Sequence, residues 1–287
     1  MTTRAERIAA AFKWACLAEL EAPKPGNVHV FAAGHRMTAD EFVRSAEAAA
    51  GPLTLQGASV GARILRAVEE TFAAVGANTN LGIVLLCAPL AAAAEADAAD
   101  LRSSLAEIVR ALDIEDANLA FRAIVQAAPA GLGHSARHDV FAPATVTLLQ
   151  AMTEAAERDR VARQYATNFA DIFDLGLPGL EAASRQHADA KWATLMIYLG
   201  FLAEFPDSHI LRKFDARTAD EVRQAAAKFR TSLQAARPLA QLLPELLAWD
   251  AALKTDGINP GTSADLTVAT LFAHRLRTIL PSARNSG

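Results

Sequence analysis

The stretch Gly76-Ala77-Asn78-Thr79-Asn80-Leu81-Gly82 separates two segments of opposite character, and the rest of the chain is arranged around it. Before it, apolar residues recur at helical spacing through 60–75. After it, residues 83–94 are wholly apolar. The pattern predicts an amphipathic helix followed by a buried one. Gly and Asn tolerate positive φ, and a polar loop that leads into a buried helix directs free N–H groups and a positive dipole end inward.

This loop supports two interpretations. In the first, Asn78, Thr79 and Asn80 belong to a pocket for an anionic or hydrogen-bonding ligand. In the second, the stretch is an ordinary turn between helices with an Asn cap. The residues of the loop alone do not separate the two interpretations, so the other loops of the chain decide between them.

Composition predicts an all-α protein. Of the 287 residues 52% are hydrophobic and only 6% aromatic, and alanine, the best helix former, supplies much of the apolar share. A chain of this length can bury a sizeable core. We expect one multi-helix globular domain over residues 1–281, with a nucleotide pocket formed by loops between helices. Residues 282–287 are expected to be a disordered tail.

Charge and apolar content exclude several classes of partner. A net charge of −4 argues against a general nucleic-acid binder. The longest apolar run contains Pro89 and stops at Glu95, short of the about 20 residues that span a bilayer. Cys16 and Cys87 lie among apolar helix positions, which is typical of buried free thiols in a reducing cytosol. We therefore expect a cytoplasmic protein with small-molecule substrates and no membrane or nucleic-acid partner, and a homodimer is compatible with the sequence.

Three further loops carry Pro or Gly together with polar residues. The first, residues 23–29, places Lys24 between two prolines and brings Asn27 close to it. Pro-ordered Lys24 is either a ligand contact or a solvent-facing lysine in a turn. In the last, residues 258–266, Thr262 or Ser263 is expected to cap a final helix. Asp265 would lie in the first turn of that helix, which its dipole favours.

The remaining loop follows Pro206 and contains Asp207, Arg212 and Lys213. Arg212 and Lys213 are the best phosphate-binding candidates, because arginine offers a bidentate fork and lysine a point charge. Asp171 and Asp174, three residues apart, would share a face of a helix. They could hold Mg²⁺ or could equally be exposed acids.

Two other groups are assigned structural roles. His134, His138 and Asp139 follow a second glycine-rich loop, whose glycines argue against a helical metal-ligand pair. The charges between Glu154 and Arg160 are expected to form the solvated face of a single long helix that reaches Tyr165.

Three loops in this order resemble the triphosphoribosyl-dephospho-CoA synthase family: PKPGNV at 23–28, NTNLG at 78–82 and NPGTSADL at 259–266. The likeness extends from about Glu19 to about Leu276. Enzymes of this family are all-helical and join ATP to 3′-dephospho-CoA with displacement of adenine. The product is the prosthetic-group precursor of citrate or malonate lyase systems. A divergent branch from archaea and methylotrophic bacteria, with PKPGNVH and NTNLG loops, is more similar still.

The resemblance implies roles for particular residues. It places Lys24, Asn78, Thr79, Asp207 and Asp265 at motif positions of the family, and Glu19 matches an acid that precedes PKPG. The chain also departs from the family pattern. Asn80 and Leu81 replace the His and Lys of NTHKG, and Arg212-Lys213-Phe214 replaces Arg-Gly-Gly. Asp171 and Asp174 are the only acids in the segment that matches a Gly/Glu-rich one.

We therefore expect an ATP-dependent transferase that joins the ribose of ATP, brought with Mg²⁺, to a hydroxyl of a cofactor precursor. The oxocarbenium-like state of such a transfer needs a nearby carboxylate, and the hydroxyl needs a base. Asp207 and Asp265 are the candidates for these two tasks, with Lys24 and the other cations orienting the triphosphate. One alternative is phosphoryl or phosphoribosyl transfer in the biosynthesis of a pterin or furan C1 carrier. Another is a non-catalytic helical nucleotide-binding protein.

Overall fold

The computed structural model describes residues 2–34, 37–96, 100–129, 132–135, 137–186, 189–235 and 239–280. Within these ranges the chain forms fourteen α-helices and one π-helix, and no β-strand. The prediction of an all-α, single-domain fold is confirmed. The predicted tail, 282–287, lies outside the described residues.

The helices come in chain order. They are α1 (Arg4–Leu20), α2 (Ala39–Leu53), α3 (Val60–Val75), α4 (Leu81–Glu95), α5 (Leu101–Ala111), α6 (Ile114–Ala127), α7 (Leu148–Ala155), α8 (Arg160–Ala166), the π-helix η1 (Asp171–Gly176), α9 (Leu177–Gln186), α10 (Ala190–Glu204), α11 (Ser208–Lys213), α12 (Ala216–Gln234), α13 (Leu239–Thr255) and α14 (Gly261–Arg277).

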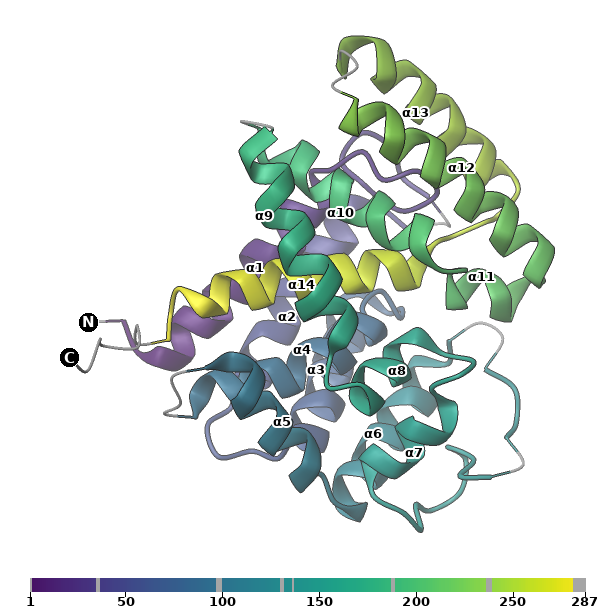
Figure 1. The fold of residues 1–287 in the computed structure, drawn as a ribbon. Helices are drawn as coiled ribbons and strands as arrows, with labels where there is room; N and C mark the ends of the chain where they lie inside the picture. The colour runs from purple at the N-terminus through teal and green to yellow at the C-terminus, as the bar shows by residue number, and fades with distance from the viewer. Residues whose placement is uncertain are drawn as a thin grey trace.

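The last helix, α14, runs through the middle of the molecule (Figure 1). It packs against α1, α4, α10 and η1, so segments from both ends of the chain share one core. Phe272 on α14 is fully buried and meets the ring of Phe12 on α1 edge-on, with the ring centroids 5.8 Å apart. Because α14 has neighbours on nearly every side, its residues have to be apolar or small along most of the helix.

Helix α4 is buried along almost its whole length, which explains the apolar run after the central loop. Many of its residues are alanine, and small side chains let α1, α3, α5 and α14 approach it closely. A second apolar cluster joins α10, α12 and α13, which lie at the opposite end of the molecule from α5, α6, α7 and α8 (Figure 1).

Local signals in the sequence set several helix ends. Thr38 and Glu41 form the expected capping box, in which Thr38 N donates to Glu41 Oε2 at 2.6 Å. Gly76 ends α3 with φ of 71°, and Asn78 Oδ1 accepts from Leu81 N at 3.2 Å at the start of α4. The interhelix turn is therefore present. Its N-cap residue, Asn80, makes no capping hydrogen bond with its side chain, and Asn78 accepts from the first N–H of α4 instead. The same loop also reaches a cavity.

The prediction of one long helix through residues 154–160 is wrong. The chain leaves the helical path after α7, and Asp159 begins α8 by accepting from Val161 N at 2.9 Å and Ala162 N at 3.1 Å. An aspartate just before a helical segment is a helix-start signal, and here it prevails over the helical spacing of the charges.

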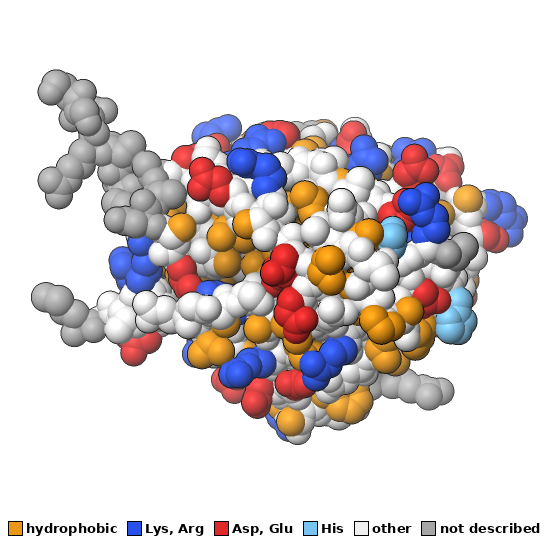
Figure 2. All heavy atoms as spheres, turned by 90° about the horizontal axis from the view of Figure 1, so that it is seen from below, with side chains coloured by type: hydrophobic (Ala, Val, Ile, Leu, Met, Phe, Trp, Pro, Cys, Tyr) orange, Lys and Arg blue, Asp and Glu red, His pale blue; other side chains and the backbone are white. Residues whose placement is uncertain are grey.

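On the face shown in Figure 2, acidic and basic side chains alternate with scattered hydrophobic ones, as the small net charge leads one to expect. Of the helices in the described ranges, none is long and apolar enough to cross a membrane.

The central position of α14 yields a stability prediction. Replacing Phe272 by Ala should lower the free energy of unfolding by about 3–5 kcal/mol, because a buried aromatic leaves a cavity that its neighbours fill only partly. Denaturant titration measures the change. Phe72→Ala, at a position 40% exposed on α3, is the matched control and should cost less than about 1 kcal/mol. Equal losses for the two variants would contradict the proposed role of α14.

Candidate active site

A cavity of about 1130 Å³ opens among the loops that precede α4, α8, α11 and α14. Its lining includes residues of the first loop, the central loop, the loop after α6 and the loop before α14. The prediction of a pocket built from interhelix loops agrees with this arrangement. A cavity of this size is large enough for a nucleotide together with part of a second molecule.

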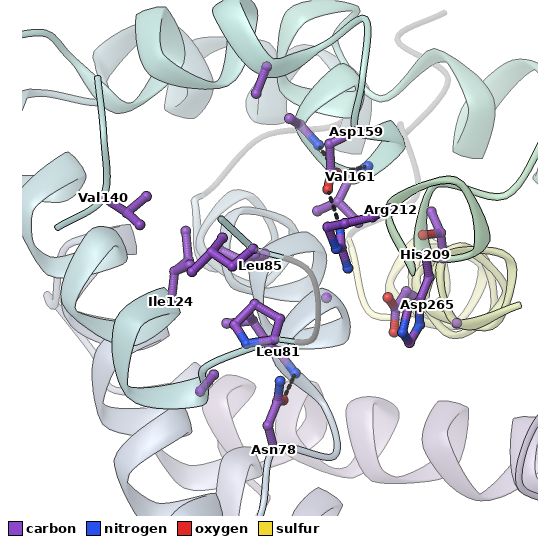
Figure 3. A pocket seen from close by; sticks show the side chains of 18 of the residues that line it. Asn78, Leu81, Leu85, Ile124, Val140, Asp159, Val161, His209, Arg212 and Asp265 are labelled. Carbon is purple, nitrogen blue, oxygen red and sulfur yellow. Dashed lines mark hydrogen bonds and ion pairs between the residues drawn. The ribbon is translucent and has the colours of Figure 1, made fainter. Parts of the chain in front are cut away.

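One side of the cavity is apolar. Figure 3 shows Leu81 and Leu85 of α4, Ile124 of α6 and Val140 around this side, whereas Val161 lies next to Asp159 and Arg212. Leu81 is one of the two positions at which the chain departs from the NTHKG motif, and it contributes an alkyl surface here. This side therefore suits an uncharged portion of a ligand.

The opposite side is charged. Arg212 of α11 donates to Asp159 Oδ2 at 3.1 Å, and both side chains keep part of their surface exposed, 27% and 30% respectively. Lys213 also lines the cavity, and its Nζ donates to Gly257 O at 3.0 Å. His209 and Asp265 lie on the same side as Arg212 (Figure 3).

Asp265 approaches the beginning of α4 very closely. A Cβ added to Gly82 would lie 2.0 Å from Asp265 Oδ2, so only glycine fits there. Desolvation raises the pKa of Asp265 well above its ordinary value. The nearby carboxylates of Asp207, Glu19 and Asp159 add to this effect, and Arg212 opposes it. Asp265 lies in the second turn of α14, so the expected first-turn dipole contact is not formed.

Lys24 is fully buried and turned away from the cavity. Its three donors are all used, by Glu19 Oε1, by Asn27 Oδ1 at 2.9 Å and by Val28 O at 2.9 Å. Burial lowers the pKa of Lys24 and raises that of Glu19, while their mutual contact opposes both shifts. Lys24 is therefore not the solvent-facing lysine of a turn, and its ammonium group contacts protein atoms and not the cavity. Lys24 instead positions Glu19 and Asn27, which do line the cavity.

A hydrogen-bonded network fastens the first loop to the last one. Asn27 Nδ2 donates to Asn259 Oδ1 at 2.8 Å, and Gly26 N donates to Asp250 Oδ1 at 2.8 Å. Lys254 Nζ donates to Asp250 Oδ2 at 2.9 Å. Two loops more than 200 residues apart in sequence thus form one wall of the cavity.

Asp207 joins α11 to α14. Its Oδ1 accepts from His209 N at 2.9 Å and Ile210 N at 3.3 Å, and its Oδ2 accepts from Ser263 N and Oγ, both at 2.8 Å. Asp207 and Ser263 have no exposed surface. Burial raises the pKa of Asp207, and these four donors counteract the shift. Asp207 and Ser263 therefore lie behind the cavity wall, and the cap expected from Ser263 comes from Asp207 instead.

The central loop divides its polar residues between the cavity and the core. Asn78 and Thr79 line the cavity. Thr79 Oγ1 donates to Ser45 Oγ at 2.6 Å. Asn80 is buried, and its Nδ2 donates to Thr71 Oγ1 at 3.1 Å, which fixes the loop on α3. Asn80 is not among the residues that line the cavity, so its predicted ligand contact stays a prediction.

Asp171 and Asp174, the expected Mg²⁺ ligands, pair with two different arginines in the structure. Asp171 accepts from Arg160 Nε at 2.6 Å and Nη2 at 2.8 Å, whereas Asp174 accepts from Arg102 Nη1 at 2.6 Å and Nη2 at 2.8 Å. The segment is a π-helix, whose wider turn does not bring residues three apart onto one face. No group of three or more metal-ligating side chains occurs among the residues that the structure describes.

Asp159 and His209 are site residues to which the sequence analysis gave no function. Asp159 was assigned to a solvated helix face, although its position before Val161-Ala162 signals a helix start. His209 follows Asp207 in a loop that sequence reasoning did associate with ligand binding. His134 also lines the cavity, and its Nδ1 lies 2.9 Å from Asp139 Oδ2.

The fold and the cavity together define an all-helical small-molecule-binding protein whose site combines an arginine, acids and amides. The model of the ATP:dephospho-CoA triphosphoribosyl transferase family matches residues 5–283. The chain belongs to this family and is a transferase, as the three loop motifs predict.

Structural comparison supports the same fold. A solved structure from Archaeoglobus fulgidus, described as a proposed triphosphoribosyl-dephospho-CoA synthase, superposes with a TM-score of 0.62 at 24% identity. The match covers 80% of this chain and 95% of that one. Among curated proteins, none matches the chain significantly.

The contact between Gly82 and Asp265 is open to a direct test. Gly82→Ala should lower the free energy of unfolding by about 1–3 kcal/mol or displace the carboxylate, because the added methyl overlaps it. Thermal and denaturant unfolding measure the change. Gly179→Ala on α9 is the control, since an added Cβ there meets no atom within 4 Å and should be neutral or slightly stabilising. If both variants match the parent in stability and activity, the close approach has no consequence.

Proposed function

We propose that the cavity binds ATP and transfers its triphosphoribosyl group to a hydroxyl of a cofactor precursor, with release of adenine. Membership of the family supports this reaction, and 3′-dephospho-CoA is the acceptor that the family name suggests. The observation that carries the proposal is the position of Asp265 beside Arg212 on the charged side of a cavity of nucleotide size.

Arg212 is the proposed anchor of the triphosphate. Its ion pair with Asp159 is partly exposed, and such pairs are worth little in water. A polyphosphate can therefore replace the carboxylate as partner and gain a bidentate contact. Lys213 supplies a second positive charge on the same wall.

Asp265 is the proposed acid. Burial raises the pKa of Asp265, which favours the protonated carboxyl group that can give its proton to the departing adenine. The resulting carboxylate then lies beside the ribose as its oxocarbenium-like charge develops. Donating a proton and stabilising the sugar are thus two successive tasks of one side chain.

Mg²⁺ would enter with the nucleotide as part of the substrate. Asp171 and Asp174 do not fit as its ligands, because each is already paired with an arginine. The steps proposed here use protein side chains only.

The comparisons do not favour either alternative. A C1-carrier enzyme finds no support in the family match, and a non-catalytic scaffold is at odds with a family of transferases. Measuring adenine release from ATP in the presence of 3′-dephospho-CoA tests the first alternative, because phosphoryl or phosphoribosyl transfer to a C1-carrier precursor does not require that acceptor.

Removing the triphosphate anchor should weaken nucleotide binding. Arg212→Ala should cost about 1.5–3 kcal/mol of ATP affinity, the range for a hydrogen bond to a charged group, which is about 10- to 150-fold in Kd. Calorimetry with ATP and Mg²⁺ measures it. Arg217→Ala on the exposed face of α12 is the control and should bind as the parent does. ATP affinity unchanged in Arg212→Ala would place the triphosphate elsewhere.

The two aspartates should differ in their mutant behaviour. Asp265→Asn should abolish adenine release while leaving ATP affinity within several-fold of the parent, because it removes the acid and not the phosphate contacts. Asp207→Asn should lower the free energy of unfolding by about 1–3 kcal/mol, because an amide leaves buried N–H donors without acceptors. Full turnover by Asp265→Asn would contradict the assigned chemistry.

A further inference from the structure

We propose that His209 is the base that takes the proton from the acceptor hydroxyl. The inference rests on the proposed function and adds a catalytic residue to it. Sequence reasoning gave this task to Asp207 or Asp265. The structure leaves Asp207 no access to a substrate, so the base has to be found among the side chains that line the cavity.

The backbone fixes the position of His209. It lies in the first turn of α11, where its N–H donates to Asp207 Oδ1 at 2.9 Å. Asp207 is in turn tied to Ser263 of α14. His209 is therefore held to α14 through a buried carboxylate, and its side chain lines the cavity.

The imidazole ring packs against the first residue of α14. A Cβ added to Gly261 would lie 2.5 Å from His209 Nδ1, so the ring fits only because residue 261 is glycine. Asp265 follows Gly261 by four residues, and residues so spaced lie on one face of a helix. Figure 3 shows His209 and Asp265 on the same side of the pocket, next to Arg212. The ring and the proposed acid thus face the same part of the cavity.

The acidic residues in and near the cavity are less suited than His209 to act as the base. Asp207 has no exposed surface, and four donors occupy its oxygens. Glu19 is paired with Lys24, and Asp159 caps α8 and pairs with Arg212. Histidine titrates near neutrality in its unperturbed form, which matches the requirement for a base at physiological pH.

The proton balance of the step closes with these two residues. The hydroxyl oxygen of the acceptor bonds to the anomeric carbon of the ATP ribose, and its proton passes to the imidazole. The bond from that carbon to adenine breaks, the electron pair leaves with adenine, and the proton of Asp265 neutralises it. Transfer of a proton from the imidazolium to the Asp265 carboxylate, directly or through water, restores both groups.

The test measures adenine release from ATP with 3′-dephospho-CoA as acceptor, between pH 5 and pH 9. The parent should lose rate toward acid pH, because a protonated base cannot accept the proton of the hydroxyl. Burial raises the pKa of Asp265, which shifts the loss of the acid toward the alkaline side. Asp265, Arg212 and Asp159 lie on the same side of the pocket as the ring (Figure 3), and Asp207 accepts from the backbone N–H of His209. His209→Gln should lower kcat by about 10²–10⁴-fold, the usual range for general base catalysis, and should abolish the acid limb only.

Two further measurements distinguish a base from a structural residue. His209→Ala should regain part of its rate when imidazole is added, because a free base can occupy the vacated space. ATP affinity by calorimetry and the unfolding midpoint should stay close to the parent in both variants. His274→Gln, on the same helix as Asp265 but away from the cavity lining, is the matched control and should behave as the parent does.

The outcomes separate this inference from the proposed function. If the parent releases adenine but His209→Gln keeps its rate within threefold and retains the acid limb, His209 is not the base, although the transferase assignment stands. Loss of rate without rescue by imidazole and with weakened ATP binding also overturns the inference, since it indicates a structural role. A parent that binds ATP but releases no adenine contradicts the proposed function, and the inference fails with it.

Discussion

The buried carboxylate of Asp207 is the interaction on which the arrangement of the site depends. It receives two N–H groups from α11 and both donors of Ser263 from α14, so it fixes the angle and the register between these helices. Arg212 is carried by one of the two helices and Asp265 by the other. A carboxyl group without exposed surface is tolerated here because four donors replace its hydration. The contact between α11 and α14 is strong because both oxygens of Asp207 accept two hydrogen bonds each. Loss of either oxygen would leave two buried donors without an acceptor.

The polar residues of the loop motifs divide into two groups. Asn27, Asn78 and Thr79 reach the cavity, whereas Lys24, Asn80 and Ser263 hold the loops in place from behind. A loop without regular structure needs such side-chain hydrogen bonds, because its own backbone N–H and C=O groups form few hydrogen bonds with one another. The residues behind the wall therefore determine the shape of the site without touching a ligand, and a motif can be dense in polar residues although few of them contact substrate.

Periodicity and composition predict most of the fold, because an apolar face at helical spacing has few other ways to be buried. The helix positions around Phe12, Ile64 and Phe272 agree with the structure on these grounds. The direction in which a loop side chain points is a different matter. Asp171 and Asp174 turn to Arg160 and Arg102, and the distance in sequence from Asp174 to Arg102 shows why no local pattern reveals the pairing. Lys24, in the loop after α1, likewise turns inward, because its ammonium group pairs with Glu19 near the end of α1.

Two glycines of the site have a consequence for how such a cavity varies between relatives. Gly82 leaves room for the carboxylate of Asp265, and Gly261 leaves room for the ring of His209. In each pair, a larger residue at the glycine position would drive the partner side chain out of its place. Neither glycine is free to change unless its partner changes as well. Positions 82 and 265, and positions 261 and 209, are accordingly expected to co-vary, so that divergence of the chemistry at this site would proceed by paired substitutions rather than single ones.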